Sequence, residues 1–325
     1  MPVDSLLTNS FAIIIGFVLL IWSADRFIFG AAAAARNMNI SPLIIGLTIV
    51  GFGTSAPEMM VAAFAAFDGS PAMAIGNALG SNITNITLVL GTTALIVPLN
   101  VHSGILKKEL PLLIIATLLT LVLLADGALG IIDGALLFSA LVVVMWWITR
   151  TALNERVHDA LEDEFDDEIP RGVPMPKAIF WLVAGLILLI ASSKILVWGA
   201  VNVATSMGIS ELVIGLTIIA IGTSLPELAA TIVGALKKEH DIAIGNIVGS
   251  NLFNTLGVLA VPGLLAPAPL AEGVLERDFP VTFVLTIALF VIAYGFRHPG
   301  RITRVEGGLL LGAFFAYQTL LYFTA

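Results

Sequence analysis

The chain has 325 residues, of which 58% are apolar and only 12% are Asp, Glu, Lys or Arg. A soluble domain carries about 25% charged residues, so the composition excludes an ordinary water-soluble enzyme and is typical of a polytopic membrane protein. The chain contains no cysteine, which excludes disulfides, thiolate metal sites and a cysteine nucleophile.

Apolar stretches predict ten membrane-spanning helices in two groups of five. The first group lies near residues 11–35, 43–67, 72–97, 110–125 and 129–149, and the second near residues 178–206, 212–236, 241–266, 279–296 and 304–324. The predicted fold class is therefore an all-α membrane protein. Its predicted domains are a five-helix repeat at 1–149, an acidic linker at 150–177 and a second five-helix repeat at 178–325. The first ten residues hold neither Lys nor Arg, so we expect the first span to belong to the fold and not to a secretory signal.

Basic residues predict the orientation of these spans, because loops rich in Lys and Arg stay in the cytoplasm. One set of alternate loops holds twelve of them: Arg36, Lys107, Lys108, Arg150, Arg156, Arg171, Lys177, Lys237, Lys238, Arg297, Arg301 and Arg304. The opposite loops hold only Arg277, and Arg26 and Lys194 lie within spans. We therefore expect a cytoplasmic linker and both termini outside, which agrees with an even number of spans.

Two segments recur at an offset of 169 residues. LIIGLTIVGFGTSAPE at 43–58 matches LVIGLTIIAIGTSLPE at 212–227 at 11 of 16 positions, and AIGNALGSNITNITLVLG at 74–91 matches AIGNIVGSNLFNTLGVLA at 243–260 at 10 of 18. Each unit holds five spans, so the second enters the membrane from the opposite side, as in the inverted repeats of secondary transporters.

Helix packing is an alternative explanation for the repeated segments. It accounts for the small-xxx-small spacings of Gly76 with Gly80 and of Gly245 with Gly249. Packing between apolar helices does not require the matched Thr, Ser, Pro, Asn and Glu residues, and these favour a shared polar site.

Glu58 and Glu227 occupy equivalent positions near the middle of the second and seventh spans. An ionised carboxylate at that depth is expensive unless another charge compensates it. Antiparallel spans that cross at the bilayer centre would bring the two acids together, where a bound cation or a proton relieves their repulsion. The pair therefore predicts a cation or proton site.

Each acid directly follows a Gly-Thr-Ser-X-Pro segment, at 53–57 and at 222–226. Proline cannot donate to the carbonyl four residues before it, so we expect the carbonyls of Gly53 and Gly222 to lose their helical partners. Broken backbone at membrane depth lines polar cavities, and its carbonyls are ligands for Ca²⁺ and Na⁺. The carbonyls expected to turn inward are those of Gly51, Thr54, Ala220 and Thr223. A simple proline kink is the alternative, which the duplicated acid disfavours.

The third and eighth spans carry further polar residues at matched positions. Ser81 and Asn85 lie four residues apart on one helix face, as do Ser250 and Asn254. An interhelical hydrogen bond explains one such pair, whereas the duplication predicts a shared polar lining.

Motifs of soluble enzymes are missing from the sequence. It holds no phosphate-binding loop, no Gly-x-Ser-x-Gly motif and no His pair at zinc spacing. We expect no enzymatic activity and no cofactor, and we expect coupling to a second ion as the energy source.

Two charged features lie outside this pattern. The linker from Arg150 to Lys177 holds eight acidic and four basic residues, a net charge of −4 that predicts a solvated connector, with Ca²⁺ sensing as the alternative. Asp25, Arg26 and Lys194 are charges within the first and sixth spans, where they either snorkel or pair across the helices.

The doubled G-T-S-x-P-E and G-N-x-x-G-S-N motifs resemble the alpha repeats of the cation/calcium exchanger superfamily, most closely the bacterial sodium/calcium exchanger type. The match covers essentially the whole chain. The resemblance implies a multi-pass protein of the bacterial inner membrane. It also implies that the second, third, seventh and eighth helices hold the ions, while the first and sixth helices slide across them.

The resemblance also assigns site residues by position. It implies that Glu58 and Glu227 are the central carboxylates, and that Asn85 matches a family asparagine. Oxygen ligands around them would come from Thr54, Thr223, Ser55, Ser224, Ser81 and Ser250, and from the carbonyls of Gly51 and Ala220. Asn254 departs from the family, because exchangers of this type often carry Asp there. This difference leaves the proton dependence, the stoichiometry and the choice of ions open.

The sequence thus predicts a secondary active antiporter that exchanges Ca²⁺ for Na⁺ by alternating access, with the ions held between Glu58 and Glu227. An antiporter of Ca²⁺ or another cation against H⁺ is the alternative, because two close carboxylates also bind protons. A cation channel is disfavoured by the inverted repeat. The predicted partners are Ca²⁺, Na⁺ and the lipid bilayer, without nucleic acid. The oligomeric state is left open and is compatible with a monomer.

Overall fold

The computed structural model describes residues 3–38, 40, 42–101, 106–154, 172–207, 220–294 and 300–324. Helices make up most of these residues, as the composition predicts. The start of the seventh predicted span at 212–219, the end of the ninth and most of the linker lie outside the described residues.

The helices follow the predicted spans in chain order. In the first half they are α1 (Val3–Met38), α2 (Pro42–Ile45), α3 (Gly51–Thr54), α4 (Ala56–Phe67), α5 (Pro71–Thr84), α6 (Leu90–Ile96), α7 (Leu106–Leu124) and α8 (Ile131–Asn154). In the second half they are α9 (Met175–Ser206), α11 (Ala220–Thr223), α12 (Leu225–Leu236), α13 (His240–Phe253), α14 (Ala260–Leu265), α15 (Phe279–Tyr294) and α16 (Arg304–Thr324). Within the described residues, the π-helical turns between them are η1 (Gly46–Val50), η2 (Asn85–Val89), η4 (Asn254–Val258) and η5 (Val274–Asp278).

Five of the described helical segments are long and apolar enough to cross a membrane. They are Leu7–Met38, Pro71–Ile96, Ile131–Arg150, Met175–Val203 and His240–Leu265. A sixth is the pair Gly46–Thr54 and Ala56–Phe67, which bends by 47°. The helical membrane class is therefore confirmed.

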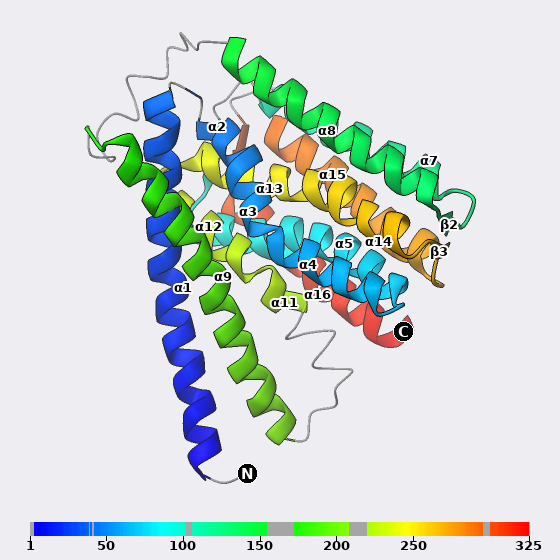
Figure 1. Cartoon of the computed structure of the whole chain (residues 1–325), viewed down its shortest axis with the longest axis horizontal. Coiled ribbons are helices and arrows are strands. Elements are labelled where there is room, and N and C mark those ends of the chain that lie inside the picture. Colours follow the sequence, from blue (N-terminus) through cyan, green and yellow to red (C-terminus); the bar gives the residue numbers. More distant parts are fainter. Residues whose placement is uncertain are drawn as a thin grey trace.

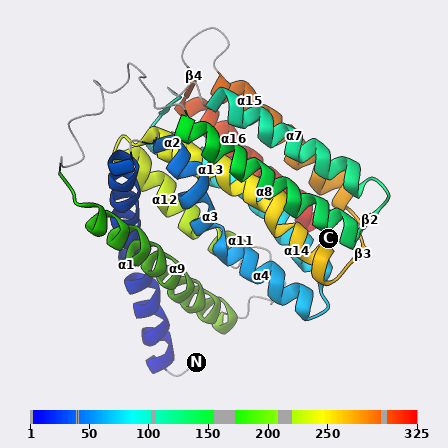
Figure 2. The ribbon, with the colours of Figure 1, turned by 45° about the horizontal axis from the view of Figure 1, so that its top comes forward.

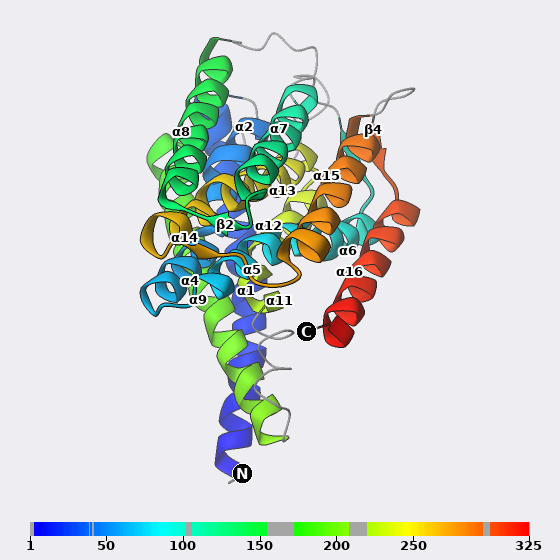
Figure 3. The same ribbon diagram turned by 90° about the vertical axis from the view of Figure 1, so that its right-hand side faces the viewer.

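Two segments at the centre of the molecule carry the repeated motifs. The segment from α13 through α14 packs against η1, α2 and α3, while the segment from α5 through α6 packs against α4 and η4. Around them, α8 lies against α14 and α7 against α15 (Figures 1 and 2), and α16 lies against α6 (Figure 3). The repeated motifs are therefore enclosed by helices on several sides.

The helices α1 and α9 form a separate long pair that extends beyond the bundle (Figures 1 and 3). Glycines at matched positions allow them to cross closely. A Cβ at Gly16 would lie 2.9 Å from the backbone nitrogen of Leu196, and one at Gly185 would lie 2.6 Å from that of Phe27. At the same crossing, the hydroxyl oxygens of Ser23 and Ser192 lie 3.5 Å apart. The two helices therefore meet through repeat-related residues.

Two short antiparallel ladders, which the sequence did not predict, join the ends of distant helices. Strand β1 (Leu99–Val101) pairs with β4 (Gly300–Ile302), and β2 (Ala128–Leu129) pairs with β3 (Ala268–Pro269). Each ladder links one half of the chain to the other.

The packing explanation for the repeated glycines holds in one half only. A Cβ at Gly249 would collide with the backbone of Leu47, so α13 and η1 need glycine there. A Cβ at Gly76 or Gly80 would meet nothing within 4 Å, so contacts between the described helices do not require glycine at these positions. The packing prediction for Gly76 and Gly80 is therefore wrong for the described residues.

Candidate functional site

Both helices that carry the paired acids break directly before them. Ser55 ends α3 with φ −80° and ψ 1°, and Ser224 precedes α12 with φ −88° and ψ 5°. Pro57 and Pro226 occupy the first turn of the helix that follows, where a missing N–H is tolerated. The break moves Glu58 and Glu227 into the first turns of α4 and α12, where the positive end of the helix dipole favours an anion.

The two carboxylates lie together in the interior. Both side chains are fully buried, and they are close enough to repel one another electrostatically. The Ser55 hydroxyl donates to Glu227 Oε1 at 3.3 Å, so the break in one half contacts the acid of the other half. The Ser81 hydroxyl lies near the Glu58 carboxylate but satisfies neither of its oxygens.

A hydrogen-bond network joins α3 to α13 on one side of the acids. The Thr54 hydroxyl donates to Asn246 Oδ1 at 3.0 Å and lies 3.3 Å from Ser250 Oγ. The Ser250 hydroxyl also donates to the Gly51 carbonyl at 3.3 Å. A Cβ at Gly51 would lie 2.9 Å from the Ser250 nitrogen, so glycine is needed for this close approach.

Two asparagines that the sequence analysis did not single out fix the backbone of the acids. Asn77 Nδ2 donates to the Glu58 carbonyl at 3.1 Å, and Asn246 Nδ2 donates to the Glu227 carbonyl at 3.3 Å. Asn77 and Asn246 are related by the 169-residue offset, within the repeated AIGN segment. That duplication was the signal that could have identified them.

The remaining polar residues lie where α5 and α13 become π-helical. Asn85 begins η2 and Asn254 begins η4, and π-helical turns are frequent at functional sites. Asn85 Nδ2 donates to Asn251 Oδ1 at 3.2 Å, and Asn82 Nδ2 donates to Thr255 Oγ1 at 2.9 Å. These bonds tie the two helices together across the centre of the molecule.

Several buried polar atoms at this centre have no hydrogen-bond partner among the described residues. They are both carboxylate oxygens of Glu58, Glu227 Oε2, Ser224 Oγ, the Oδ1 atoms of Asn82 and Asn85, Asn251 Nδ2 and both amide atoms of Asn254. Buried polar groups are normally satisfied, and unpaired buried carboxylates are costly. Most of these atoms are oxygen acceptors, which are the ligands that Ca²⁺ and Na⁺ take.

The other residues assigned by resemblance differ in burial. Ser81, Ser224 and Ser250 are buried, and Thr223 is half-buried at the end of α11. Ala220 is the first residue of α11. The Gly222 carbonyl, which Pro226 deprives of a helical donor, accepts a hydrogen bond from Ser193 Oγ of α9 at 3.0 Å. The described residues contain no cluster of three or more His, Cys, Asp or Glu side chains.

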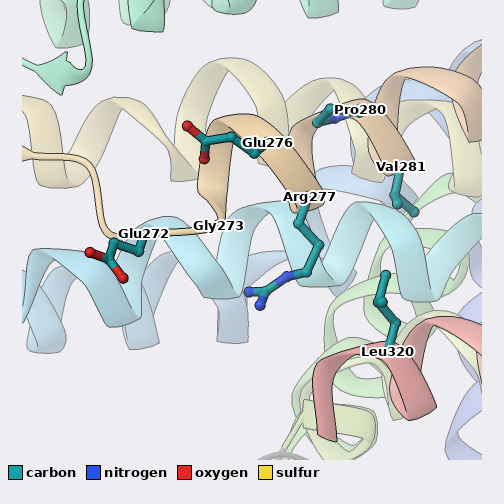
Figure 4. A pocket seen from close by; sticks show the side chains of 7 residues that line it. All are labelled: Glu272, Gly273, Glu276, Arg277, Pro280, Val281 and Leu320. Carbon is teal, nitrogen blue, oxygen red and sulfur yellow. The ribbon is translucent and has the colours of Figure 1, made fainter. Parts of the chain in front are cut away.

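A hollow of about 560 Å³ lies apart from this centre, between the start of α15 and α16 (Figure 4). It is lined by Glu272, Gly273, Glu276, Arg277, Pro280, Val281 and Leu320. Arg277 Nε lies 2.7 Å from Asp278 Oδ1, which also accepts from the Tyr317 hydroxyl at 3.0 Å. Asp278 therefore links Arg277 in η5 to Tyr317 of α16.

Comparison with known proteins gives matches along nearly the whole chain. The model of the family described as sodium/calcium exchanger protein matches residues 9–150 and 177–323. The putative antiporter CaxA of Alkalimonas amylolytica is 50% identical over 98% of this chain and 99% of its own. The inner membrane protein YrbG of Escherichia coli is 40% identical over 95% of each chain.

The fold is also that of a solved exchanger. The structure of the sodium-calcium exchanger NCX_Mj soaked with zero Na⁺ and Ca²⁺ superposes with a TM-score of 0.84 and 29% identity, covering 97% of this chain and 99% of that chain. The proteins it matches are transporters, so this protein is a transmembrane cation antiporter and not an enzyme. Because the family model matches on both sides of the linker and the putative antiporter CaxA is 50% identical over almost all of its length, the chain belongs to the sodium/calcium exchanger family.

Proposed function

We propose that this antiporter exchanges Ca²⁺ for Na⁺ by alternating access, and that the ions bind between Glu58 and Glu227. The observation that carries the proposal is the set of buried, unpaired oxygen atoms contributed by both halves of the chain. Two carboxylates supply a charge of −2, which one Ca²⁺ or two Na⁺ ions neutralise. The neutral ligands would be the hydroxyls of Thr54, Thr223, Ser55, Ser224, Ser81 and Ser250, the amides of Asn85 and Asn254, and the carbonyls of Gly51 and Ala220.

A transported ion must also leave, which favours a site of few charges. Tight Ca²⁺ sites use several carboxylates, whereas this site combines two carboxylates with neutral oxygens. The hydrogen bonds among Thr54, Ser250 and Gly51 hold their oxygens in place before an ion arrives. The oxygens are therefore organised in advance, while the low charge allows release.

We further propose ten spans in two inverted five-helix repeats, with both termini outside the bacterial inner membrane and residues 150–177 in the cytoplasm. The distribution of Lys and Arg supports this orientation, and the 169-residue offset supports the inversion. The offset also carries α4 onto α12 and α5 onto α13 without any change of length.

The direct test is counterflow with the purified protein in proteoliposomes. An outward Na⁺ gradient should drive ⁴⁵Ca²⁺ uptake that saturates with Ca²⁺ concentration. Vesicles with equal Na⁺ on both sides are the control. If the Na⁺ gradient moves no ⁴⁵Ca²⁺, the ion assignment is wrong.

The same vesicles separate the two other functions considered. Ca²⁺ flux driven by a pH gradient in the absence of Na⁺ would indicate H⁺ as the counter-ion, which Asn254 in place of the common Asp leaves open. Flux that neither saturates nor shows counterflow would indicate a channel.

A further inference from the structure

The two halves of the chain pack differently around α1 and α9. The helix α1 packs along α12, whereas within the described residues α9 makes no comparable contact with α4, the repeat equivalent of α12. The matched side chains reflect this difference, since Val233 on α12 is 8% exposed and Phe64 on α4 is 62% exposed. In this state the α1–α9 pair therefore covers the α12 end of the core and leaves the α4 end uncovered.

An ion pair fastens α1 to the covered end. Lys237 Nζ lies 2.8 Å from Asp25 Oδ1, and Lys237 is the residue that follows α12. The neighbouring Arg26 is a weaker partner, because its Nε lies 3.8 Å from Asp25 Oδ2 and its guanidinium lies over the ring of Trp181. The charge of Asp25, which the sequence left between snorkelling and pairing, is thus engaged by the end of α12.

The repeat places a copy of this pair, with both signs reversed, at the uncovered end. The 169-residue offset takes Asp25 to Lys194 and Asp68 to Lys237. Asp68 follows α4 just as Lys237 follows α12, with nearly the same backbone angles. Lys194 and Asp68 are exposed, and neither has an ion-pair partner in the part of the chain that the structure describes.

We propose that these two pairs are alternating latches of the transport cycle. In the present state, the Asp25–Lys237 pair holds α1 over α12 and so keeps the α12 end of the core closed. After α1 and α9 have moved, the Lys194–Asp68 pair forms, holds α9 over α4 and keeps the α4 end of the core closed. The proposal rests on alternating access as proposed above, but it does not depend on which cations are exchanged.

Two physical arguments support the reversed pair. A lysine without a partner inside an apolar helix is costly, and a carboxylate that reaches it in the second state would lower that cost. An antiporter must also populate both states, so the loss of one ion pair needs a matching gain. Because both members change sign together, attraction is preserved at each end, while Asp25 with Asp68 or Lys194 with Lys237 would repel.

Cross-linking of paired cysteines tests the latches, and the cysteine-free chain needs no prior mutation. Two full-length double variants, Asp25→Cys/Lys237→Cys and Lys194→Cys/Asp68→Cys, would be reconstituted and treated with a short bifunctional thiol reagent. We expect the first pair to cross-link rapidly and the second to cross-link more slowly, as the protein visits the other state. Each cross-link should stop transport. When the cross-linker contains a reducible disulfide, cleaving it with a reducing agent should restore transport.

The mismatched variants Asp25→Cys/Asp68→Cys and Lys194→Cys/Lys237→Cys are the controls, since they use the same four positions. The proposal predicts no cross-link in either. The proposal is overturned if, in protein that transports, the cysteines of Lys194→Cys/Asp68→Cys cross-link no faster than those of the mismatched variants. If both matched pairs cross-link but the parent protein shows no Na⁺-driven Ca²⁺ flux, the latches stand and the ion assignment is wrong instead. The single-cysteine variants, eluting as the parent protein does in gel filtration, establish that each substitution permits folding.

A charge substitution then measures the balance between the two latches. Within the Lys194→Cys/Asp68→Cys protein, Asp25→Asn removes the present latch and should raise the cross-linking rate about two- to fivefold, the shift expected from a partly exposed ion pair. Glu272→Gln, which neutralises an exposed acid that belongs to neither latch, should leave the rate unchanged. An unchanged or lower rate with Asp25→Asn would contradict the proposal.

Discussion

Glu58 and Glu227 are fully buried, yet three of their four carboxylate oxygens have no hydrogen-bond partner among the described residues. Their backbones, by contrast, are held by Asn77 and Asn246 through matched hydrogen bonds. The acids are thus fixed in position while their oxygens are left available. This combination is expected for a ligand site and would be unfavourable in a purely structural core.

We therefore expect Glu58→Gln and Glu227→Gln to abolish ion transport without unfolding the protein. A bound cation and a buried carboxylate form a pair of opposite charges. Removing the carboxylate charge costs about 3–5 kcal/mol, which corresponds to a loss of at least about 100-fold in ion affinity. Thermal unfolding in detergent should show an unchanged or higher Tm without ions, because one repelling carboxylate is gone, and no further rise with Ca²⁺.

Glu272→Gln, at an exposed loop position, is the matched control and should keep both flux and the Ca²⁺-dependent rise in Tm. Flux near that of the parent protein in either Glu58→Gln or Glu227→Gln would remove these two acids from the proposed ion site.

Asn254 bears on the choice of the coupling ion. It is fully buried at the start of η4, and both of its amide atoms lack partners among the described residues. An amide supplies an oxygen ligand but neither charge nor an exchangeable carboxylate proton. The difference from Asp therefore concerns the coupling ion and not the architecture.

At the scale of elements, proline and glycine decide how the helices meet. Pro57 and Pro226 break two helices so that each acid begins a new one. Gly51 allows α3 to approach α13, and Gly16 and Gly185 allow α1 to cross α9. The same residues that weaken isolated helices therefore bring the polar backbone of different helices into contact.

We predict that Gly185→Ala destabilises the crossing of α1 and α9. The added Cβ would lie 2.6 Å from the backbone nitrogen of Phe27, so the helices would have to separate. Overpacking of this kind costs about 1–3 kcal/mol, measurable as a lower Tm in detergent.

Gly312→Ala provides the comparison, because a Cβ there meets nothing within 4 Å along α16. The helix preference for alanine should make that variant neutral or more stable by up to about 1 kcal/mol. Equal Tm values for Gly185→Ala and Gly312→Ala would show that the crossing tolerates a larger separation.

At the scale of the whole molecule, the repeats have similar sequences but different environments. The covering of α12 by α1, with α4 left uncovered by α9, is an asymmetry between equivalent elements. An alternating-access transporter needs such an asymmetry, since exchanging the two environments carries the same site from one side to the other.

The proposed orientation predicts which single cysteines an impermeant thiol reagent can label in intact cells. Glu272→Cys, in the loop before α15, should be labelled from outside, because that loop is expected to be extracellular. Asp163→Cys, in the linker, should be labelled only after the membrane is permeabilised. Labelling of both positions, or the reverse pattern, would contradict the inverted ten-span arrangement.

Much of the fold and of the candidate site could be read from patterns that repeat. Apolar runs predicted the helical membrane class, and the prolines predicted breaks that the structure places at Ser55 and Ser224. The duplicated segments drew attention to Glu58 and Glu227, which the structure brings together. The π-helical turns at Asn85 and Asn254 carry no such signal, because they depend on how α5 and α13 pack.

The partners of the charged and polar side chains could not be predicted, because they come from distant parts of the chain. Asp25 pairs with Lys237 and Ser193 reaches the Gly222 carbonyl. Of the repeated glycines, Gly249 contacts another helix, whereas Gly76 and Gly80 meet no described neighbour. Repeat symmetry assigns the two halves equal roles, whereas one conformation of the molecule makes their contacts unequal.

The sequence by itself determined the class of protein, the membrane-embedded acids and the breaks beside them, because hydropathy, proline geometry and the cost of buried charge act locally. Only the tertiary structure decided which oxygen atoms remain unpaired, which end of the core α1 covers and which of the two charge pairs is formed. These features depend on the relative positions of whole helices, and two such arrangements are compatible with one repeated sequence.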